Sequence, residues 1–338
     1  MQTEISSRKS GPTRPRVVAL SGGVGGAKLV RGLDGVVRAG NGQLTVAVNT
    51  GDDFEHLGLH ICPDLDSVVY ALAGINDPLR GWGRANESWN FMRALEALGG
   101  AGWFSLGDRD LALHIERSQR LRRGDSLSKV TAYLADQFNL DATVLPATDD
   151  MVRTMVHTDA GILPFQQYFV REACKPAVKS ISFAGADKAR ANPALLSALA
   201  DPRLDAIVLC PSNPYLSIDP ILAIPGVRKA LEHASAPVIA VSPVINGDAL
   251  KGPTAKIMRE LGNDVSPAAI VSHYGDMIDA IVVDSLDAAG AFQIDLPVLA
   301  TNITMHCTED KEALARNVLH FASTLVASRG GALQERLP

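Results

Sequence analysis

The sequence lacks most features of secreted, membrane and nucleic-acid-binding proteins. No apolar run is long enough to span a bilayer, and a net charge of −5 leaves no broad basic surface for nucleic acid. The 338 residues contain four cysteines, without a CxxC pair or metal-ligand spacing: Cys62, Cys174, Cys210 and Cys307. We therefore expect buried free thiols in a cytoplasmic protein with no membrane or nucleic-acid partner.

What is present is an ordinary globular composition, with 46% apolar and 20% charged residues. The length suits one large α/β domain or two closely joined ones. Residues 1–16 are polar, and no apolar signal segment follows them. We predict a disordered leader there, and not a secretory signal.

The first ordered segment reads as a strand–helix–strand unit. Val17–Leu20 is a short apolar run, followed by glycines and then by a helical pattern from Ala27 to Val37. Leu44–Val48 supplies the next strand. Two strands flanking one helix are typical of a parallel sheet.

The pattern changes between residues 66 and 200, where helical periodicity dominates and strand candidates near Val144 and Phe169–Val170 are weak. Clear strand signals return at 206–209, 238–241, 281–283 and 298–299. We predict an α/β fold with a doubly wound, mainly parallel, Rossmann-like sheet. Residues 17–65 and 201–330 would form its core, and residues 66–200 a mostly helical insertion.

A glycine-rich loop lies between the first strand and the first helix, with glycines at 22, 23, 25 and 26. Glycines let the backbone approach a ligand, and a helix N-terminus attracts anions. The loop fits neither common nucleotide fingerprint. Ala27 and Leu29 break the Walker A pattern, and Lys28 replaces the third glycine of GxGxxG. A tight turn without a ligand is the alternative.

Four carboxylates follow the second strand: Asp52, Asp53, Asp64 and Asp66. The carboxyl ends of parallel strands are where such folds bind ligands. Hard oxygen donors suit Mg²⁺, which commonly takes one or two carboxylates together with substrate phosphates. The alternative is that these acids form turns and cap helices.

Three further groups of residues have weaker signals. His56 and His60 have zinc-pair spacing but lack the glutamate of HExxH, so we interpret them as structural. Trp82 and Trp103 could stack on a flat ring, and Arg109 could reach phosphate. Loops carrying Ser212 and Asn213, or Lys251 beside a glycine, follow later strands. For these residues, surface turns and a solvated lysine are the alternatives.

Seven motifs occur in one order: SGGVGGAK, NTGDD, CPDLDS, GWG, LGDRDLALH, PSNPYLSI and VSPVINGDALKGPTAK. In this order they resemble the 2-phospho-L-lactate transferase family of coenzyme F420 biosynthesis, including its phosphoenolpyruvyl transferase members. The likeness extends from Val17 to beyond Lys256 and so covers most of the chain.

The resemblance implies an Mg²⁺-dependent transfer to the deazaflavin Fo. The donor would be a guanosine diphosphate carrying a three-carbon acid, either phospholactate or phosphoenolpyruvate. The ribityl hydroxyl of Fo attacks the β-phosphorus, and GMP leaves. A cytoplasmic homodimer is expected.

The resemblance also assigns roles to residues. Asp52 and Asp66 would hold the metal, Asp66 would also contact Fo, and Asp53 or Asp64 could accept the proton. The helical insertion, with Ser105, Asp108 and Arg109, would border Fo. The guanosine diphosphate side would be formed by Gly22, Gly23, Gly25, Gly26, Lys28, Ser212, Asn213, Lys251 and Thr254.

Two other classes of protein stay open. A nicotinamide oxidoreductase would use the glycine loop for pyrophosphate, although the third glycine of its fingerprint is missing. A non-catalytic regulator would bind guanine nucleotide without metal-dependent turnover. Binding of GMP, Fo and NADH separates the first possibility from a transferase, and turnover separates the second.

Overall fold

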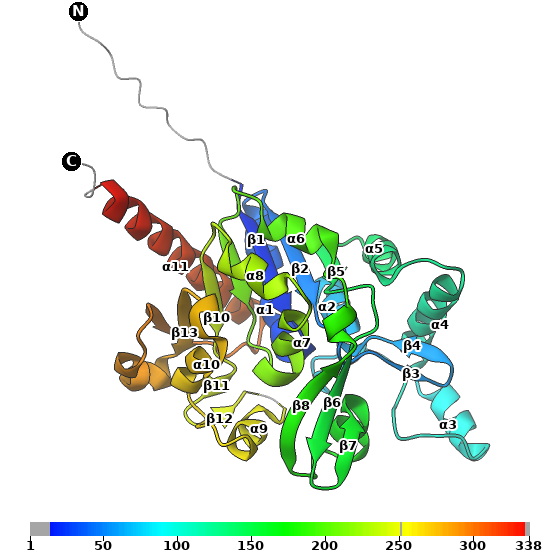
Figure 1. The fold of residues 1–338 in the computed structure, drawn as a ribbon. Coiled ribbons are helices and arrows are strands. Elements are labelled where there is room, and N and C mark those ends of the chain that lie inside the picture. The colour runs from blue at the N-terminus through cyan, green and yellow to red at the C-terminus, as the bar shows by residue number, and fades with distance from the viewer. Residues whose placement is uncertain (1–13, 251, 335–338) are drawn as a thin grey trace, which may run out of the picture.

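A computed structural model describes residues 14–250 and 252–334. Its centre is a seven-stranded sheet in which every pairing is parallel (Figure 1). Across the sheet the strands are β14 (Val298–Thr301), β13 (Ala280–Asp284), β10 (Val238–Val241), β9 (Ala206–Leu209), β1 (Arg16–Ser21), β2 (Gln43–Val48) and β5 (Thr143–Pro146). Counted along the chain, the spatial order is 7-6-5-4-1-2-3. This is the doubly wound order, and the predicted fold class is confirmed.

The strands are apolar along their whole length because both faces of the sheet are covered. In β1, Val18 and Leu20 belong to the core on one face, whereas Val17 and Ala19 belong to the core on the other. This alternation follows from the two-residue period of a strand. The predicted strands at 206–209 and 238–241 coincide with β9 and β10.

Helices cover both faces of the sheet (Figure 1). One core contains side chains of α1 (Gly23–Ala39), α2 (Pro63–Ala73), α5 (Leu127–Gln137) and α11 (Thr308–Gln334). The other contains side chains of α6 (Pro193–Leu199), α7 (Asp219–Leu222), α8 (Val227–Glu232), α9 (Thr254–Glu260) and α10 (Pro267–Tyr274). At Gly32 in α1 a Cβ would collide with the Lys311 carbonyl of α11, so this glycine permits the two helices to approach closely.

The segment 66–200 is less uniform than its helical pattern predicts. It contains α3 (Asn90–Ala97), α4 (Asp108–Arg122) and α5, but its strand β5 pairs with β2 in the central sheet. It also forms a separate antiparallel sheet from β7 (Gly161–Pro164), β6 (Arg153–Thr158) and β8 (Val178–Ala184). The predicted insertion therefore has to be corrected, because it contributes a strand to the core and is not mostly helical throughout.

The predicted strand at Phe169–Val170 is wrong. These residues lie in a π-helical turn, Gln167–Arg171, and the rings of Phe165 and Phe169 stack with centroids 5.3 Å apart. The four-residue spacing of the two rings is a helical spacing. It outweighs the strand preference of the aromatic and branched residues.

Two short hairpins complete the fold. They are β3 (Phe54–His56) with β4 (Leu59–Ile61), and β11 (Val244–Ile245) with β12 (Asp248–Ala249). Of the expected leader, residues 1–13 lie outside the described residues, and Arg16 already belongs to β1. Among the helices of the described residues, none is both long enough and apolar enough to cross a membrane.

Candidate active site

A cavity of about 870 Å³ lies where the loops after β1, β2, β9 and β10 converge. β1 and β9 are neighbours at the point where the strand order reverses, which is the usual ligand position in such sheets. The described residues that line the cavity are Gly22–Gly25, Lys28, Asp52, Pro63, Asp64, Ser67, Pro78, Arg80–Trp82, Trp103–Ser105, Phe165, Gln166, Phe169, Val170, Pro211–Asn213, Leu216, Ser217, Pro243, Leu250, Gly252–Thr254 and Ile303–His306. The prediction of a cleft at the carboxyl edge of the sheet is confirmed.

The glycine loop is held by the loop after β9. The Ser212 hydroxyl donates to the Gly22 carbonyl oxygen at 2.8 Å and accepts from the Gly22 N–H at 3.2 Å. A Cβ on Gly25 would lie 2.6 Å from the Pro211 carbonyl oxygen, so only glycine allows this approach. Ser212 thus shapes the loop, a role that its small polar side chain fulfils from a buried position.

The loop leads into α1, whose N-terminus has no side-chain cap and no acidic residue in its first turn. Free N–H groups and the helix dipole at such an end favour an anion. Lys28, one turn into α1, lines the cavity and donates from Nζ to the Met305 carbonyl oxygen at 2.8 Å. This side of the cavity is therefore suited to phosphate.

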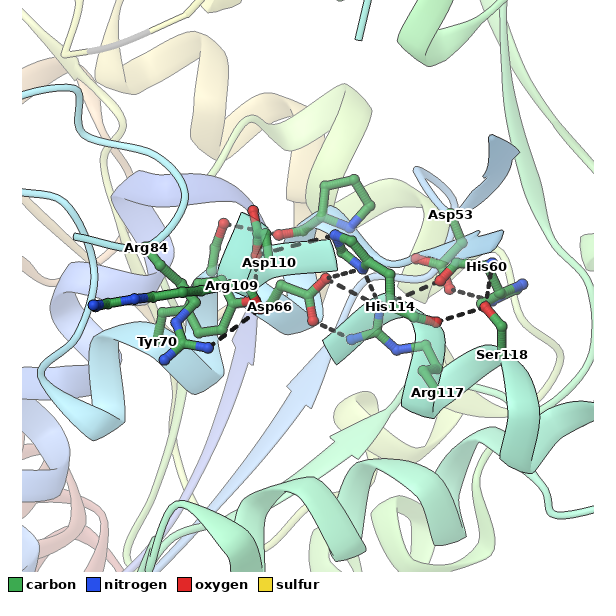
Figure 2. Close-up of polar contacts among 12 residues, drawn as sticks. Asp53, His60, Asp66, Tyr70, Arg84, Arg109, Asp110, His114, Arg117 and Ser118 are labelled. Atoms are coloured by element: carbon green, nitrogen blue, oxygen red, sulfur yellow. Dashed lines mark hydrogen bonds and ion pairs between the residues drawn. The ribbon is translucent and has the colours of Figure 1, made fainter. Parts of the chain in front are cut away.

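The four predicted carboxylates separate into two groups. Asp64 and Asp66 are two residues apart on α2, hence about 200° apart around its axis, and they point to opposite sides. Asp64 lines the cavity together with Asp52. Asp66 faces Arg117 of α4, whose two terminal nitrogens contact both carboxylate oxygens (Figure 2). Asp66, predicted to lie beside Asp52, is therefore outside the cavity, and Asp64 lines it together with Asp52.

The two cavity carboxylates are buried without a cationic partner among the described residues. Burial raises the pKa of Asp64 to about 6, although Asn49 Nδ2 donates to its Oδ2 at 2.9 Å. Burial and the charge of Asp64 raise the pKa of Asp52 well above its ordinary value. Within the described chain, Asp52 Oδ1 has no hydrogen-bond partner. Two crowded carboxylates, one of them with an unsatisfied oxygen, are a donor set that fits Mg²⁺.

Asp53 does not line the cavity. Its Oδ2 lies 3.6 Å from His60 Nε2. Asp52 lies in a turn that the Asp53 N–H closes by donating to the Thr50 carbonyl oxygen at 3.2 Å, and Asp53 directly precedes β3. Of the two carboxylates that could accept a proton, only Asp64 therefore borders the cavity.

Asn213 has a divided role. Its Oδ1 accepts from the N–H groups of Tyr215 at 3.0 Å and Leu216 at 3.1 Å, capping the π-helical turn Pro214–Ile218. Its Nδ2 is buried and has no hydrogen-bond partner among the described residues, at the cavity wall. Thr254 also lines the cavity. Lys251 lies outside the described residues.

Of the four residues expected beside Fo, Asp66, Asp108 and Arg109 do not line the cavity. Asp108 accepts from Ser88 Oγ at 2.6 Å and from the N–H of Phe91 at 3.0 Å, and these bonds lower its pKa to about 2. It caps α3. Arg109 is exposed and outside the lining. Ser105 is in the lining as expected.

Five aromatic side chains, here called the aromatic wall, line the cavity instead. Trp82 and Trp103, for which stacking was expected to be possible, line the cavity with Phe104, Phe165 and Phe169. Sequence reasoning missed the last three as site residues. The helical spacing of Phe165 and Phe169 could have shown that these two rings lie on one face. A cavity that offers both flat aromatic faces and an anion site suits a ligand with a ring and a phosphate.

Comparisons with known proteins identify the family. A family model described as 2-phospho-L-lactate transferase CofD matches residues 17–308. The chain belongs to this family. It is thus a transferase that handles a phospho-acid in coenzyme F420 biosynthesis, and the expected family is confirmed.

Relatives named phosphoenolpyruvate transferase match nearly the whole chain. The protein of Kitasatospora aureofaciens is 41% identical over 90% of this chain and 99% of its own length. That of Streptomyces griseus is 38% identical over 92% and 100%, and that of Mycolicibacterium smegmatis 39% over 91% and 98%. The crystal structure of a UPF0052 family member from Bacillus halodurans has a TM-score of 0.63 at 18% identity, covering 91% and 100% of the two chains. That likeness supports the fold alone.

Proposed function

We propose that the protein transfers phosphoenolpyruvate from a guanosine diphosphate-activated donor to the terminal ribityl hydroxyl of Fo, and releases GMP. One observation carries the proposal. The Asp52–Asp64 carboxylates and the open N-terminus of α1 face one cavity, and a Cβ on Gly22 would lie only 2.6 Å from Asp64 Oδ2. An anion site touching an unneutralised acid pair requires a cation between them. The names of the relatives favour phosphoenolpyruvate over phospholactate.

The donor's diphosphate would bind at the N-terminus of α1, with Lys28 on one side and the Ser212–Asn213 loop on the other. Asp52 and Asp64 would hold Mg²⁺, which supplies charge neutralisation for the phosphates when bound. The ribityl oxygen forms a bond to the β-phosphorus, and the bond from that phosphorus to the α–β bridging oxygen breaks. GMP leaves with that oxygen. Positioning and charge compensation are the main demands of such a transfer.

The hydroxyl proton would pass to Asp64. Of the two candidate bases, Asp53 and Asp64, only Asp64 borders the cavity, so a carboxylate oxygen of Asp64 would be the one in reach of the ribityl hydroxyl proton. General-base assistance of this kind contributes about 10²–10⁴-fold. Asn49 would orient the Asp64 carboxylate through its hydrogen bond to Oδ2.

The deazaflavin ring would lie against Trp82, Trp103 and the three phenylalanines of the aromatic wall. Offset or edge-to-face contacts of this kind contribute about 0.5–1.5 kcal/mol each beyond burial of area. This placement directs the ribityl chain toward the glycine loop, which lines the same cavity.

The test is a product analysis. The protein is incubated with Fo, Mg²⁺ and either the phosphoenolpyruvyl or the phospholactyl donor, and the products are weighed by mass spectrometry. We expect GMP and the phosphoenolpyruvyl adduct of Fo, both abolished by a chelator. Binding of guanine nucleotide without turnover would instead favour a regulator, and binding of NADH an oxidoreductase. The homodimer is a further proposal, resting on the family resemblance, and sedimentation velocity tests it.

A further inference from the structure

We propose that Asp53, His60 and Cys62 form a second metal site, for Zn²⁺ or a similar thiophilic divalent ion, outside the cavity. One ligand atom from each residue lies within 4.8 Å of the other two. None of the three residues lines the cavity described above. The site is therefore separate from the carboxylates of Asp52 and Asp64.

The β3–β4 hairpin brings the three side chains to one face. Its register pairs Phe54 with Ile61 and Glu55 with His60. Extending this register by one residue places Asp53 opposite Cys62, and side chains at opposite positions have Cβ atoms about 4.5–5.5 Å apart. His60 precedes Cys62 by two residues and so shares its face. The convergence follows from the strands, although the sequence spacing resembles no zinc motif.

The polar atoms at this place are left unsatisfied. Asp53 is 2% exposed, and among the described residues its Oδ1 has no hydrogen-bond partner. His60 is only partly buried, but its Nε2 also has no hydrogen-bond partner among the described residues and lies 3.6 Å from Asp53 Oδ2. Buried polar groups are normally hydrogen-bonded, so these orphan atoms need a partner. A cation bound between them would satisfy both.

The charged groups around the site do not oppose the binding of a cation. Arg117 lies on the neighbouring helix α4, but Asp66 neutralises it (Figure 2). The Oγ of Ser118, also on α4, accepts a hydrogen bond from the His60 backbone N–H at 2.7 Å, which holds the β4 strand without engaging the His60 imidazole. His114 points at Asp66 and not at Asp53.

The donor set favours zinc over magnesium. Thiolate, imidazole and carboxylate are the usual protein ligands of Zn²⁺, and three protein ligands leave the fourth position for water. Bond lengths of about 2.0–2.3 Å imply tetrahedral ligand separations of roughly 3.3–3.8 Å. The 3.6 Å between Asp53 Oδ2 and His60 Nε2 already falls in this range, and the whole cluster lies within 4.8 Å. Cys62 would bind the ion as a thiolate, so metal binding would release the thiol proton.

The site would connect two segments that carry the cavity carboxylates. Asp53 directly follows Asp52, and Cys62 precedes Asp64 by two residues. A metal joining Asp53 to Cys62 fixes the distance between these segments. We therefore infer a positioning role for the ion, in addition to the Mg²⁺ proposed for the cavity.

Metal content and cobalt spectroscopy test the proposal without relying on activity. The full chain is purified with zinc, then stripped and reloaded with Co²⁺. We expect about one zinc per chain and a thiolate-to-cobalt charge-transfer band. Cys62→Ala should abolish the band, whereas Cys210→Ala, which removes another buried thiol outside the cluster, should keep it.

Asp53→Asn and His60→Gln are the companion variants, because each preserves the size of the side chain. Each should weaken metal binding by at least about tenfold while circular dichroism stays unchanged. They decide the question even where Cys62→Ala fails to fold. The proposal is overturned when the native chain gives no charge-transfer band, or when metal binding in the Asp53 and His60 variants equals that of the native chain.

Discussion

The two sides of the first turn of α2 differ in whether their buried carboxylates are paired with a cation. On one side, Asp64 and Asp52 face the cavity without a cation among the described residues. On the other, Asp66 is paired with Arg117, and both are almost fully buried (Figure 2). Residues that are neighbours in sequence thus serve different purposes. The Asp66–Arg117 pair joins α2 to α4, whereas Asp52 and Asp64 line the cavity without such a partner among the described residues.

The compensated side extends into a network between α2 and α4. The Tyr70 hydroxyl donates to Asp110 Oδ1, and burial, together with the charge of Asp66, raises the pKa of Asp110 to about 6. Burial lowers the pKa of His114 to about 4, so this imidazole is neutral at pH 7. The network holds α4 against the core and thereby supports the wall of the cavity that the 103–105 segment forms.

The largest expected effect comes from breaking the compensated pair. Arg117→Met leaves the Asp66 carboxylate buried without its cation, and such a loss costs about 3–5 kcal/mol. Urea unfolding at pH 7.5 measures the change in the free energy of unfolding.

The double variant Arg117→Met with Asp66→Asn is the matched control. It removes both charges, so it should recover a large part of the lost stability, since a neutral replacement avoids the isolated charge. If the free energy of unfolding of Arg117→Met alone lies within about 1 kcal/mol of the native value, the structural role of the pair is contradicted.

On the uncompensated side, loss of activity should dominate. Asp52→Asn and Asp64→Asn should each lower turnover by about 10²–10³-fold, because each removes charge where the phosphate and its metal meet. Folding should be retained, as removal of one of two crowded carboxylates relieves repulsion. Steady-state kinetics over a range of Mg²⁺ concentrations measures the loss.

Asp34→Asn is the control for this pair. Asp34 is also a buried acid whose pKa is raised by burial, but it lies in α1 beyond the cavity. Its replacement should leave turnover near normal. Near-normal turnover in both the Asp52 and Asp64 variants at limiting Mg²⁺ would show that the metal is held elsewhere.

Sequence reasoning predicted the parallel sheet and the meeting of its loops, because apolar runs and strand ends are local signals. It did not separate Asp64 from Asp66. Choosing between them requires the position of Arg117, which is 51 residues further along the chain. The same holds for Asp108, which resembled a ligand residue but caps α3. A residue whose role depends on a partner far along the chain cannot be recognised from its local motif.

The next effect is a pH dependence of stability. The Asp64 pKa is about 6 in the folded state against an ordinary value of 3.8. The folded state therefore binds this proton more tightly, and the ionised group destabilises the fold above pH 6. The penalty fades as the pH falls and is absent below about pH 4.

Asp64→Asn should accordingly stabilise the metal-free protein most above pH 6, by about 1–3 kcal/mol. The gain should vanish toward pH 4. Unfolding by urea between pH 4 and pH 8, with chelator present, measures the difference between the two proteins. A gain that does not change with pH would mean that the substitution acts through packing and not through charge.

The smallest expected effect concerns Asn213, where a capping oxygen and an unsatisfied Nδ2 belong to one side chain. Guanine presents a carbonyl that this Nδ2 could meet, so Asn213→Ala should weaken GDP binding by about 1–3 kcal/mol and Fo binding less. Asn213→Ser separates the two halves of the side chain, because serine can still cap the Pro214–Ile218 turn but lacks the amide donor. Calorimetry with each ligand alone should therefore show a similar GDP loss in both variants. If Asn213→Ser binds GDP normally, the side-chain oxygen that caps the turn is sufficient for GDP binding, and Asn213 only shapes the loop. Equal losses for GDP and Fo would likewise place the guanine contact elsewhere.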